Sequence, residues 1–239
     1  MTRTSPVATA DVERRITALF DRYAQSPLLA DDLAPEDFQW RETVDFLGRL
    51  EGRRVLDVGC GKGRFLSALS SCGAHAVGLE PSSEVGKAAR TRGHRVVRAS
   101  ASRIPFVDGT FDACICVEVL EHVPDTDAAL REMARVLRSG GRLVVIDKSA
   151  FALHPKWFVP WALVKRAKEL SGRWMYPRGF PFREKWFRPG ALARKMGRHF
   201  RHVEVRHLVG DTSPPGRLRG AILRWIPSVS LYVAWRAVK

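Results

Sequence analysis

The sequence has few of the features that would place it in a membrane, among disulfide-rich proteins or among zinc proteins. Its 239 residues include only four cysteines, with neither a C-x-x-C pair nor the spacing of zinc ligands. We therefore expect buried, reduced thiols at Cys60, Cys72, Cys114 and Cys116. The longest stretch without a charged residue, Phe65 to Leu79, has fifteen residues and is too short and too polar to span a bilayer. The first ten residues hold no apolar signal region, so a cytoplasmic protein is expected.

Acidic residues are scarce in one part of the chain only. Residues 1–149 carry 21 Lys+Arg and 21 Asp+Glu, whereas residues 150–239 carry 19 basic and 4 acidic side chains. The second part therefore carries the whole net charge of +15, and it also holds six of the seven tryptophans. An apolar content of 45% over this length is enough for one sizeable core. The composition predicts one electrically neutral domain with a basic, aromatic addition.

The most informative motif is Val55 to Gly63, which reads Val-Leu-Asp-Val-Gly-Cys-Gly-Lys-Gly. The apolar run Arg53 to Val58 predicts a buried parallel strand, and the glycines allow a sharp turn and a close approach to a ligand. The dinucleotide fingerprint G-x-G-x-x-G needs a glycine where Arg64 stands. A G-x-x-x-x-G-K-[ST] run is also absent. The turn therefore favours a nucleoside ligand without a pyrophosphate.

Further apolar segments follow the glycine turn at the intervals of a doubly wound sheet. The strand Ala74 to Leu79 ends in Glu80-Pro81, and an acid at the end of a second strand accepts hydrogen bonds from ribose hydroxyls. Later strands are expected at His94 to Arg98, Ala113 to Val117 and Arg142 to Ile146, with a helix at Ala128 to Leu137.

Together these segments resemble the class I S-adenosylmethionine-dependent methyltransferases of the type 11 group, over about residues 53 to 149. The resemblance implies an α/β fold with a Rossmann-like, doubly wound, seven-stranded, mostly parallel sheet whose last strand is antiparallel. It also implies S-adenosyl-L-methionine as cofactor. Many relatives hold the adenine amino group with an Asp at the place of Ser100, so here we expect Ser100 or Ser102 to make that contact. The cofactor positions implied are Arg41, Asp57, Gly59, Cys60, Gly61, Gly63, Glu80, Pro81, Ser100, Ala101, Val117 and Glu118. Arg41 has an equally good interpretation as a surface residue of an amphipathic helix.

The segment Glu118 to His122 is similar to the E-x-x-E-H segment of the O-methyltransferases of ubiquinone biosynthesis. That similarity implies a divalent cation held by Glu118, Glu121 and His122 beside the acceptor hydroxyl. A phenol has a pKa of about 10, so its proton must be removed during methyl transfer. Either a metal ion or a base, His122 with Glu121, would serve. A purely structural role of Glu121 and His122 in fixing the loop is the alternative, and metal binding ranks below both.

The basic, aromatic segment 150–187 falls where family members carry substrate-binding insertions. It contains an apolar group (Trp157, Phe158, Trp161, Leu163 and Val164) beside basic residues (Lys165, Arg166 and Lys168), which is the composition of an interfacial helix, and Arg217 to Ile226 is a second candidate. These residues are open to three interpretations: core tryptophans with solvated charges, an anionic membrane surface, or nucleic acid. Nucleic acid ranks last because no RNA-binding module is recognisable.

The sequence thus predicts O-methylation of a hydrophobic, anionic or membrane-associated small molecule or lipid-like acceptor, with peripheral membrane association as a possibility to test. The alternatives are an RNA-directed methyltransferase and a cofactor-binding protein without turnover. The chain is expected to divide into a disordered tail (1–10), helices covering the cofactor (11–50), the cofactor core (51–149), the insertion (150–187) and a last helix and strand pair (188–239). The first helices are expected at Val12 to Ala24 and Pro35 to Leu50, the last at Ala191 to Phe200, and the final strands at His202 to Val209 and Ser230 to Val238. No pattern sets an oligomeric state.

Overall fold

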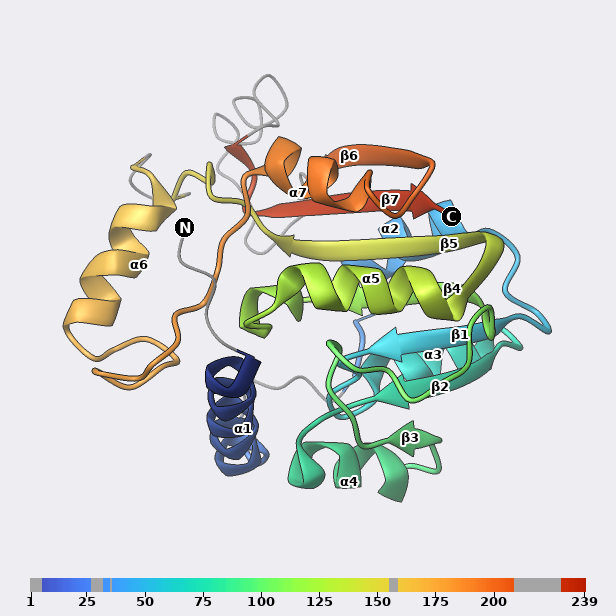
Figure 1. The fold of residues 1–239 in the computed structure, drawn as a ribbon, viewed down its shortest axis with the longest axis horizontal. Helices are drawn as coiled ribbons and strands as arrows, with labels where there is room; N and C mark the ends of the chain where they lie inside the picture. Colours follow the sequence, from blue (N-terminus) through green and yellow to red (C-terminus); the bar gives the residue numbers. More distant parts are fainter. Residues whose placement is uncertain (1–5, 27–31, 35, 155–158, 209–228) are drawn as a thin grey trace.

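A seven-stranded sheet organises the molecule (Figure 1). The computed structural model describes residues 6–26, 32–34, 36–154, 159–208 and 229–239. The strand order is β3-β2-β1-β4-β5-β7-β6, and only β7 runs antiparallel to its neighbours. The strands are β1 (Arg54–Val58), β2 (His75–Leu79), β3 (Val96–Val97), β4 (Phe111–Val117), β5 (Leu137–Lys148), β6 (His202–Leu208) and β7 (Tyr232–Val238). This confirms the predicted Rossmann-like α/β architecture.

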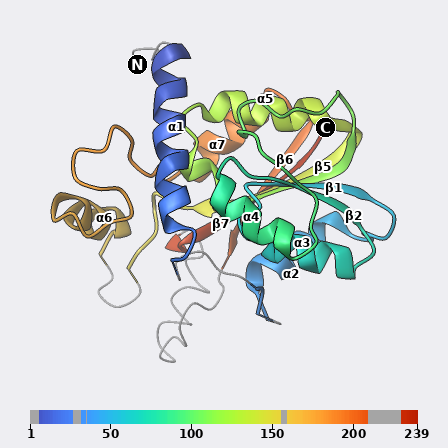
Figure 2. The same cartoon turned by 90° about the horizontal axis from the view of Figure 1, so that it is seen from below.

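Helices cover both faces of the sheet (Figures 1 and 2). Side chains of the central strands alternate between two buried clusters, because successive residues of a strand point to opposite faces. One cluster packs against α5 and α7, and the other against α2 and α3. The helices are α1 (Pro6–Tyr23), α2 (Phe38–Leu47), α3 (Arg64–Ser71), α4 (Ser83–Thr91), α5 (Thr126–Val136), α6 (Trp161–Leu170) and α7 (Pro189–Met196), with the 3-10 turn η1 (Leu120–His122). None of these helices is long and apolar enough to cross a membrane.

Several helix starts are set by side-chain caps that the sequence already contains. The Asp37 carboxylate accepts hydrogen bonds from the first backbone amides of α2, Ser82 caps α4 and Asp125 caps α5. Ion pairs then fix α2 on the sheet, since Arg236 of β7 donates at 2.6 Å each to the buried Glu42 and to the exposed Asp45. The position of α2 therefore depends on a contact between residues almost two hundred positions apart.

Some predicted boundaries were wrong. Helix α1 begins at Pro6, so residues 6–10, which were assigned to a disordered tail, are helical; residues 1–5 lie outside the described residues. Proline suits a first helical turn because its missing N–H has no partner there. Helix α2 is shorter than the predicted span because its cap is Asp37 and Gly48 ends it with φ +71°. The third strand has two residues only, and β5 starts directly at Leu137, where a helix end was predicted.

The carboxyl ends of the parallel strands carry the segments that extend beyond the basic fold. In Figure 1, α1 stands beside the ends of β1 and β2, and α6 lies further out on the same side. Helix α1 joins the insertion through a small apolar cluster that includes Ile16, Leu19, Tyr176 and Phe182. The sheet order reverses between β1 and β4, and ligands of doubly wound sheets bind at such a reversal.

Candidate active site

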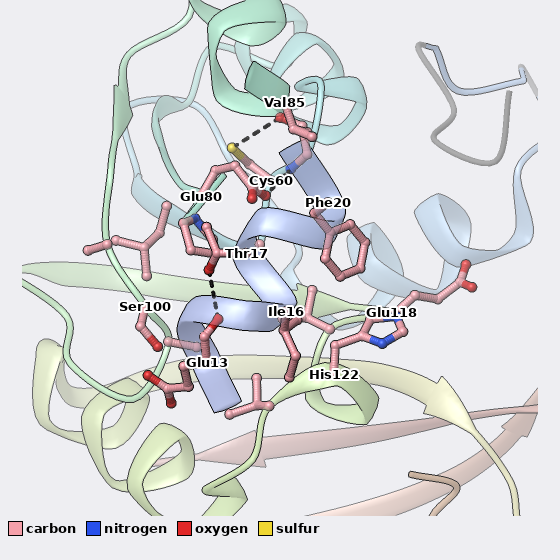
Figure 3. Close-up of a pocket in the computed structure, with 18 of the residues that line it drawn as sticks. Glu13, Ile16, Thr17, Phe20, Cys60, Glu80, Val85, Ser100, Glu118 and His122 are labelled. Carbon is pink, nitrogen blue, oxygen red and sulfur yellow. Dashed lines mark hydrogen bonds between the residues drawn. The ribbon is translucent and has the colours of Figure 1, made fainter. Parts of the chain in front are cut away.

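A cavity of about 800 Å³ opens at the carboxyl ends of β1, β2 and β4 (Figure 3). Its wall includes most of the residues that the sequence had singled out. These are Asp57, Gly59, Cys60, Gly61, Glu80, Pro81, Ser100, Ala101, Val117, Glu118, Glu121 and His122. The cavity thus joins the predicted donor region and the predicted acceptor region in one continuous space.

The glycine turn forms the floor of the cavity because its backbone adopts conformations that favour glycine. Gly59 has φ +73°, and a Cβ there would clash with Val119. Gly61 has φ +55°, lines the cavity, and would place a Cβ at a point with no heavy atom within 4 Å. The amides of Gly59 and Cys60 both donate to the Leu79 carbonyl, at 2.7 and 3.0 Å. This bond pair ties the turn to the end of β2.

Two buried acids at the turn are poised to receive a ligand. Burial raises the pKa of Asp57 to about 7, and its Oδ2 atom has no hydrogen-bond partner. Burial also raises the pKa of Glu80 to about 7, although its carboxylate accepts from the amides of Ser82 at 2.9 Å and Gly61 at 3.1 Å. An orphaned buried carboxyl oxygen is costly unless a ligand supplies a donor. The pair fits the ammonium and hydroxyl groups of S-adenosylmethionine.

Helix α1 roofs the cavity, at the place where the resemblance implied that N-terminal helices cover the cofactor. Its Glu13 carboxylate accepts from Ser102 Oγ at 2.7 Å, and its Asp21 carboxylate accepts from Ser82 Oγ at 2.5 Å. In Figure 3, Glu13 lies toward Ser100, whereas Phe20 lies toward His122. The rings of Phe20 and His122 meet edge to face at 5.2 Å. The roof therefore contacts both ends of the cavity.

Arg41 and Gly63 do not line the cavity. The Arg41 side chain on α2 is 71% exposed and pairs only loosely with Glu36, at 4.0 Å. Gly63, with φ +88°, starts α3, and a Cβ there would meet His94 at 2.9 Å and Ala89 at 3.2 Å. Close packing between α3 and α4 explains this glycine. The structure therefore assigns Arg41 to the surface and Gly63 to helix packing.

The residues after β4 form a hydrogen-bonded chain at the other end of the cavity. His122 Nδ1 lies 2.9 Å from the Tyr176 hydroxyl, and His122 Nε2 lies 3.3 Å from Glu121 Oε1. Since a carboxylate only accepts, Nε2 carries the proton and Nδ1 accepts from Tyr176. Burial raises the pKa of Tyr176 above its usual range, so the hydroxyl stays protonated. Glu118, with φ 56°, is the single non-glycine residue in the described part of the chain with a left-handed backbone.

A lysine that the sequence analysis did not single out lies among these acids. Lys148 Nζ is 2.5 Å from Glu121 Oε1, 3.2 Å from Glu184 Oε1 and 3.4 Å from Glu118 Oε2. Burial would lower the pKa of Lys148, but the three carboxylates raise it well above its usual value, so the ammonium is retained. For Glu121, burial would raise the pKa, but His122 and Lys148 lower it. We call Lys148 and these three glutamates the carboxylate cage.

The donors at this end do not fit a divalent cation. Both ring nitrogens of His122 have partners, and the Lys148 ammonium stands between the two glutamates that would bind the metal. Among the described residues, no group of three or more His, Cys, Asp or Glu side chains converges as metal ligands do. The three residues Glu118, Glu121 and His122 lie near one another but are not arranged as a metal site.

The second half of the insertion contacts the site, and the described tryptophans of the insertion pack against other residues of the insertion. Met175 lines the cavity, and the Glu184 carboxylate accepts from the indole N–H groups of Trp174 and Trp186. Trp161 is half-buried against His154 and Trp186, with ring centroids 4.4 and 6.1 Å apart. The predicted interfacial face is therefore smaller than expected, because Trp161 and Lys165 turn inward; Trp157, Phe158 and Arg217 to Ile226 lie outside the described residues.

Some of the residues missed by sequence reasoning could have been recognised from their position in the sequence, and others could not. Lys148 is the last residue of β5 and Glu118 follows β4, and the carboxyl ends of neighbouring parallel strands meet at one edge of a sheet. That position was a usable signal. Glu13 and Asp21 lie in the helix that was expected to cover the cofactor, and Tyr176 and Glu184 lie in the predicted insertion, but no motif singled out these four side chains.

Comparisons with known proteins agree with this geometry. Residues 56–145 match a family model described as a methyltransferase domain. A ubiquinone biosynthesis O-methyltransferase of Marinobacter nauticus is 32% identical over 183 residues, 72% of each chain. A demethylmenaquinone methyltransferase of Mycolicibacterium paratuberculosis is 38% identical over 168 residues, 66% of this chain and 72% of that protein. A match to an uncharacterized methyltransferase of Mycobacterium sp. is 46% identical over 97 residues and spans only 38% of that protein.

Among solved structures, an S-adenosylmethionine-dependent methyltransferase of Thermotoga maritima, a possible histamine N-methyltransferase, superposes with a TM-score of 0.62. The alignment covers 94% of this chain and 99% of that one at 20% identity, so it supports the fold. Together with the sequence relatives, it shows that the chain belongs to the class I S-adenosylmethionine-dependent methyltransferases. Its cofactor is S-adenosylmethionine, and its reaction is methyl transfer.

Proposed function

We propose that this enzyme methylates a hydroxyl group on a hydrophobic, ring-containing acceptor similar to a quinol. The observation that carries this proposal is the continuity of the cavity, which runs from the Gly59–Gly61 turn to Glu121 and His122. The apolar side chains of Ile16 and Phe20 line the same space. Two relatives named for quinone biosynthesis give independent support for an acceptor of this class.

In the proposed complex, the donor end of the cavity is held by the chain's own acids and amides. Asp57 receives the ammonium group of the methionine part, and Glu80 accepts from the ribose hydroxyls. Ser100 and Ala101 lie beside the adenine. The acid that many relatives carry at the place of Ser100 is supplied here by Glu13, whose carboxylate is already within 2.7 Å of Ser102 Oγ. Helix α1 excludes water from this end.

S-adenosylmethionine supplies a methyl group on a sulfonium, which is open to in-line attack. His122 faces the acceptor end of the cavity, and Glu121 fixes its tautomer so that Nδ1 is the basic nitrogen. When bound, S-adenosylmethionine would give its methyl group to the acceptor oxygen and leave as the neutral thioether, while His122 would take the proton of the acceptor hydroxyl. Tyr176, now on Nδ1, either yields that position to the acceptor or relays the proton.

We propose that residues 150–187 build the acceptor side of the site and bring it to an anionic lipid surface. On α6, Leu163 and Leu170 are 64% and 57% exposed, and they lie seven residues apart on one side of the helix with Arg166 between them. Phe151 is a further exposed apolar side chain of the insertion, at 53%. Apolar side chains ringed by Lys and Arg suit the boundary between headgroups and acyl chains, where lipid-like acceptors reside.

Acceptor identity is tested with methyl-labelled S-adenosylmethionine and a panel of acceptors. We expect label to move into the organic phase with polyprenylated catechols or hydroquinones, and to stay in water with transfer RNA or amines. Replacing His122 with Ala should lower kcat by about 100-fold or more, because a positioned base contributes 10²–10⁴. Label in RNA or in an amine would overturn the O-methylation proposal.

Membrane association is tested by flotation with vesicles. We expect binding to vesicles that contain an anionic lipid and little binding to neutral ones at physiological salt. Leu163→Glu should weaken binding about tenfold, because it removes an inserted apolar group and adds a repelled charge. Val107→Glu is the matched control, since Val107 is 77% exposed but lies outside the insertion. If the two substitutions weakened vesicle binding equally, the proposed docking role of α6 would be contradicted.

A further inference from the structure

The carboxylate cage joins residues from distant parts of the chain around one ammonium group. Glu118 and Glu121 come from the segment after β4, Lys148 ends β5, and Glu184 belongs to the insertion. The Glu121 and Glu184 side chains are 1% and 2% exposed, and that of Lys148 is 17% exposed on the cavity wall. Buried carboxylates this close need a positive partner, because their mutual repulsion is poorly screened.

We infer that the Lys148 ammonium replaces the divalent cation that the E-x-x-E-H segment holds in similar enzymes, so that methyl transfer here needs no added metal. The inference rests on the proposed function for its catalytic part. Its structural part rests on geometry: two of the three cage glutamates are the residues assigned to the metal, and Lys148 Nζ contacts both. A lysine, unlike a bound metal ion, cannot dissociate.

Lys148 acts as a positioning residue. It holds Glu121 Oε1, the same oxygen that lies 3.3 Å from His122 Nε2, and so fixes the imidazole that faces the acceptor. It also draws in Glu184, whose pKa is raised by burial and by the charge of Glu121. Arg64 lies 3.8 Å from Glu118 Oε1, too far to replace Lys148, and Lys165 Nζ donates to the backbone carbonyl of Glu184 at 2.9 Å. Gln39 and Tyr232 donate to the Glu118 carboxylate, at 2.9 and 3.2 Å, and help to hold it beside Lys148.

The test combines metal binding with activity, using Mn²⁺ as the probe and electron paramagnetic resonance as the readout. Wild-type protein should bind no Mn²⁺ at the cage and should keep full activity in chelator. Lys148→Ala opens the three carboxylates and should gain a Mn²⁺ site. Without metal, the kcat of this variant should fall about 100-fold while its KM for S-adenosylmethionine stays unchanged. Added Mn²⁺ should raise the kcat of the variant again by at least about tenfold. Lys195→Ala is the control, because Lys195 pairs with the single carboxylate of Asp127, at 3.0 Å, and lies outside both the cage and the insertion.

Chelator-sensitive wild-type activity, or wild-type Mn²⁺ binding that Glu121→Gln abolishes, would overturn the inference. Full activity of Lys148→Ala without metal would do the same. If that variant fails to fold, seen as lost S-adenosylmethionine binding in calorimetry, the two wild-type measurements decide the question. The Mn²⁺ measurement needs no acceptor, so a wrong acceptor assignment changes the activity result and leaves the binding result intact.

Discussion

Asp57→Asn is expected to stabilise the cofactor-free protein and to weaken S-adenosylmethionine binding by about 100-fold. The two effects have one cause. Burial raises the pKa of Asp57 from 3.8 to about 7, so at pH 7.5 the folded protein holds a buried, partly unpartnered charge. Asparagine removes that charge, which should add about 1–3 kcal/mol to the free energy of unfolding. It also removes the partner of the cofactor's ammonium group, at a cost of about 1.5–3 kcal/mol in binding.

The ionisation of Asp57 makes both the stability of the fold and the affinity for the cofactor depend on pH, in opposite directions. The folded protein keeps the Asp57 proton at pH values where the unfolded chain has lost it, so this group's contribution to stability falls as pH rises from about 4 toward 7. Affinity for the positively charged S-adenosylmethionine should change in the opposite direction, because ionised Asp57 attracts its ammonium group. The affinity of the wild type for this cofactor should improve up to about tenfold between pH 6 and 7.5. Glu80 contributes with the same sign, so Asp57→Asn should flatten the profile only in part.

Calorimetry at the two pH values and chemical denaturation check these expectations. Asp112→Asn is the control, because Asp112 lies at the opposite end of β4 and its carboxylate accepts from the Arg54 amide and from Arg138. It should lose stability and keep cofactor affinity. If Asp57→Asn bound S-adenosylmethionine as tightly as the wild type at both pH values, Asp57 would not be a cofactor ligand.

Gly61→Val is expected to abolish measurable cofactor binding while leaving the fold intact. A Cβ added at Gly61 meets no protein atom within 4 Å, so the valine side chain extends into the cavity that Gly61 lines. A small stability loss, about 1–2 kcal/mol, comes from φ +55°, which valine disfavours. The loss of affinity should exceed 100-fold, since the ligand and the added methyl groups compete for one space.

Gly52→Val gives a closely matched control. Gly52 has φ +68° and also has no neighbour within 4 Å of an added Cβ, but it does not line the cavity. Both variants should show the same small fall in thermal stability, and only Gly61→Val should lose cofactor binding in calorimetry. Similar affinities of the two variants would place the cofactor away from the glycine turn.

The donor half of the site could be predicted from sequence because its parts are local. Asp57, Gly59 and Gly61 lie in one continuous turn, and their residue types follow from the turn's backbone and from close approach to a ligand. Glu80 needed one further step, the rule that an acid ending the second strand faces a ribose. Of the two interpretations given for Arg41, the structure favours the surface residue, because its helix presents the side chain to solvent, and the apolar pattern had left that helix rotation open.

The sequence by itself determined the sheet, the glycine turn and the class of cofactor, since strand periodicity and turn chemistry are properties of neighbouring residues. Only the tertiary structure decided which side chains surround the acceptor end of the cavity and which side chains of α1 close the donor end. Lys148 meets Glu184 across 36 positions, and Glu13 meets Ser102 across 89, through contacts that exist only once the insertion and α1 pack on the core. Charge pairs of this kind depend on distance in space, which no local pattern encodes.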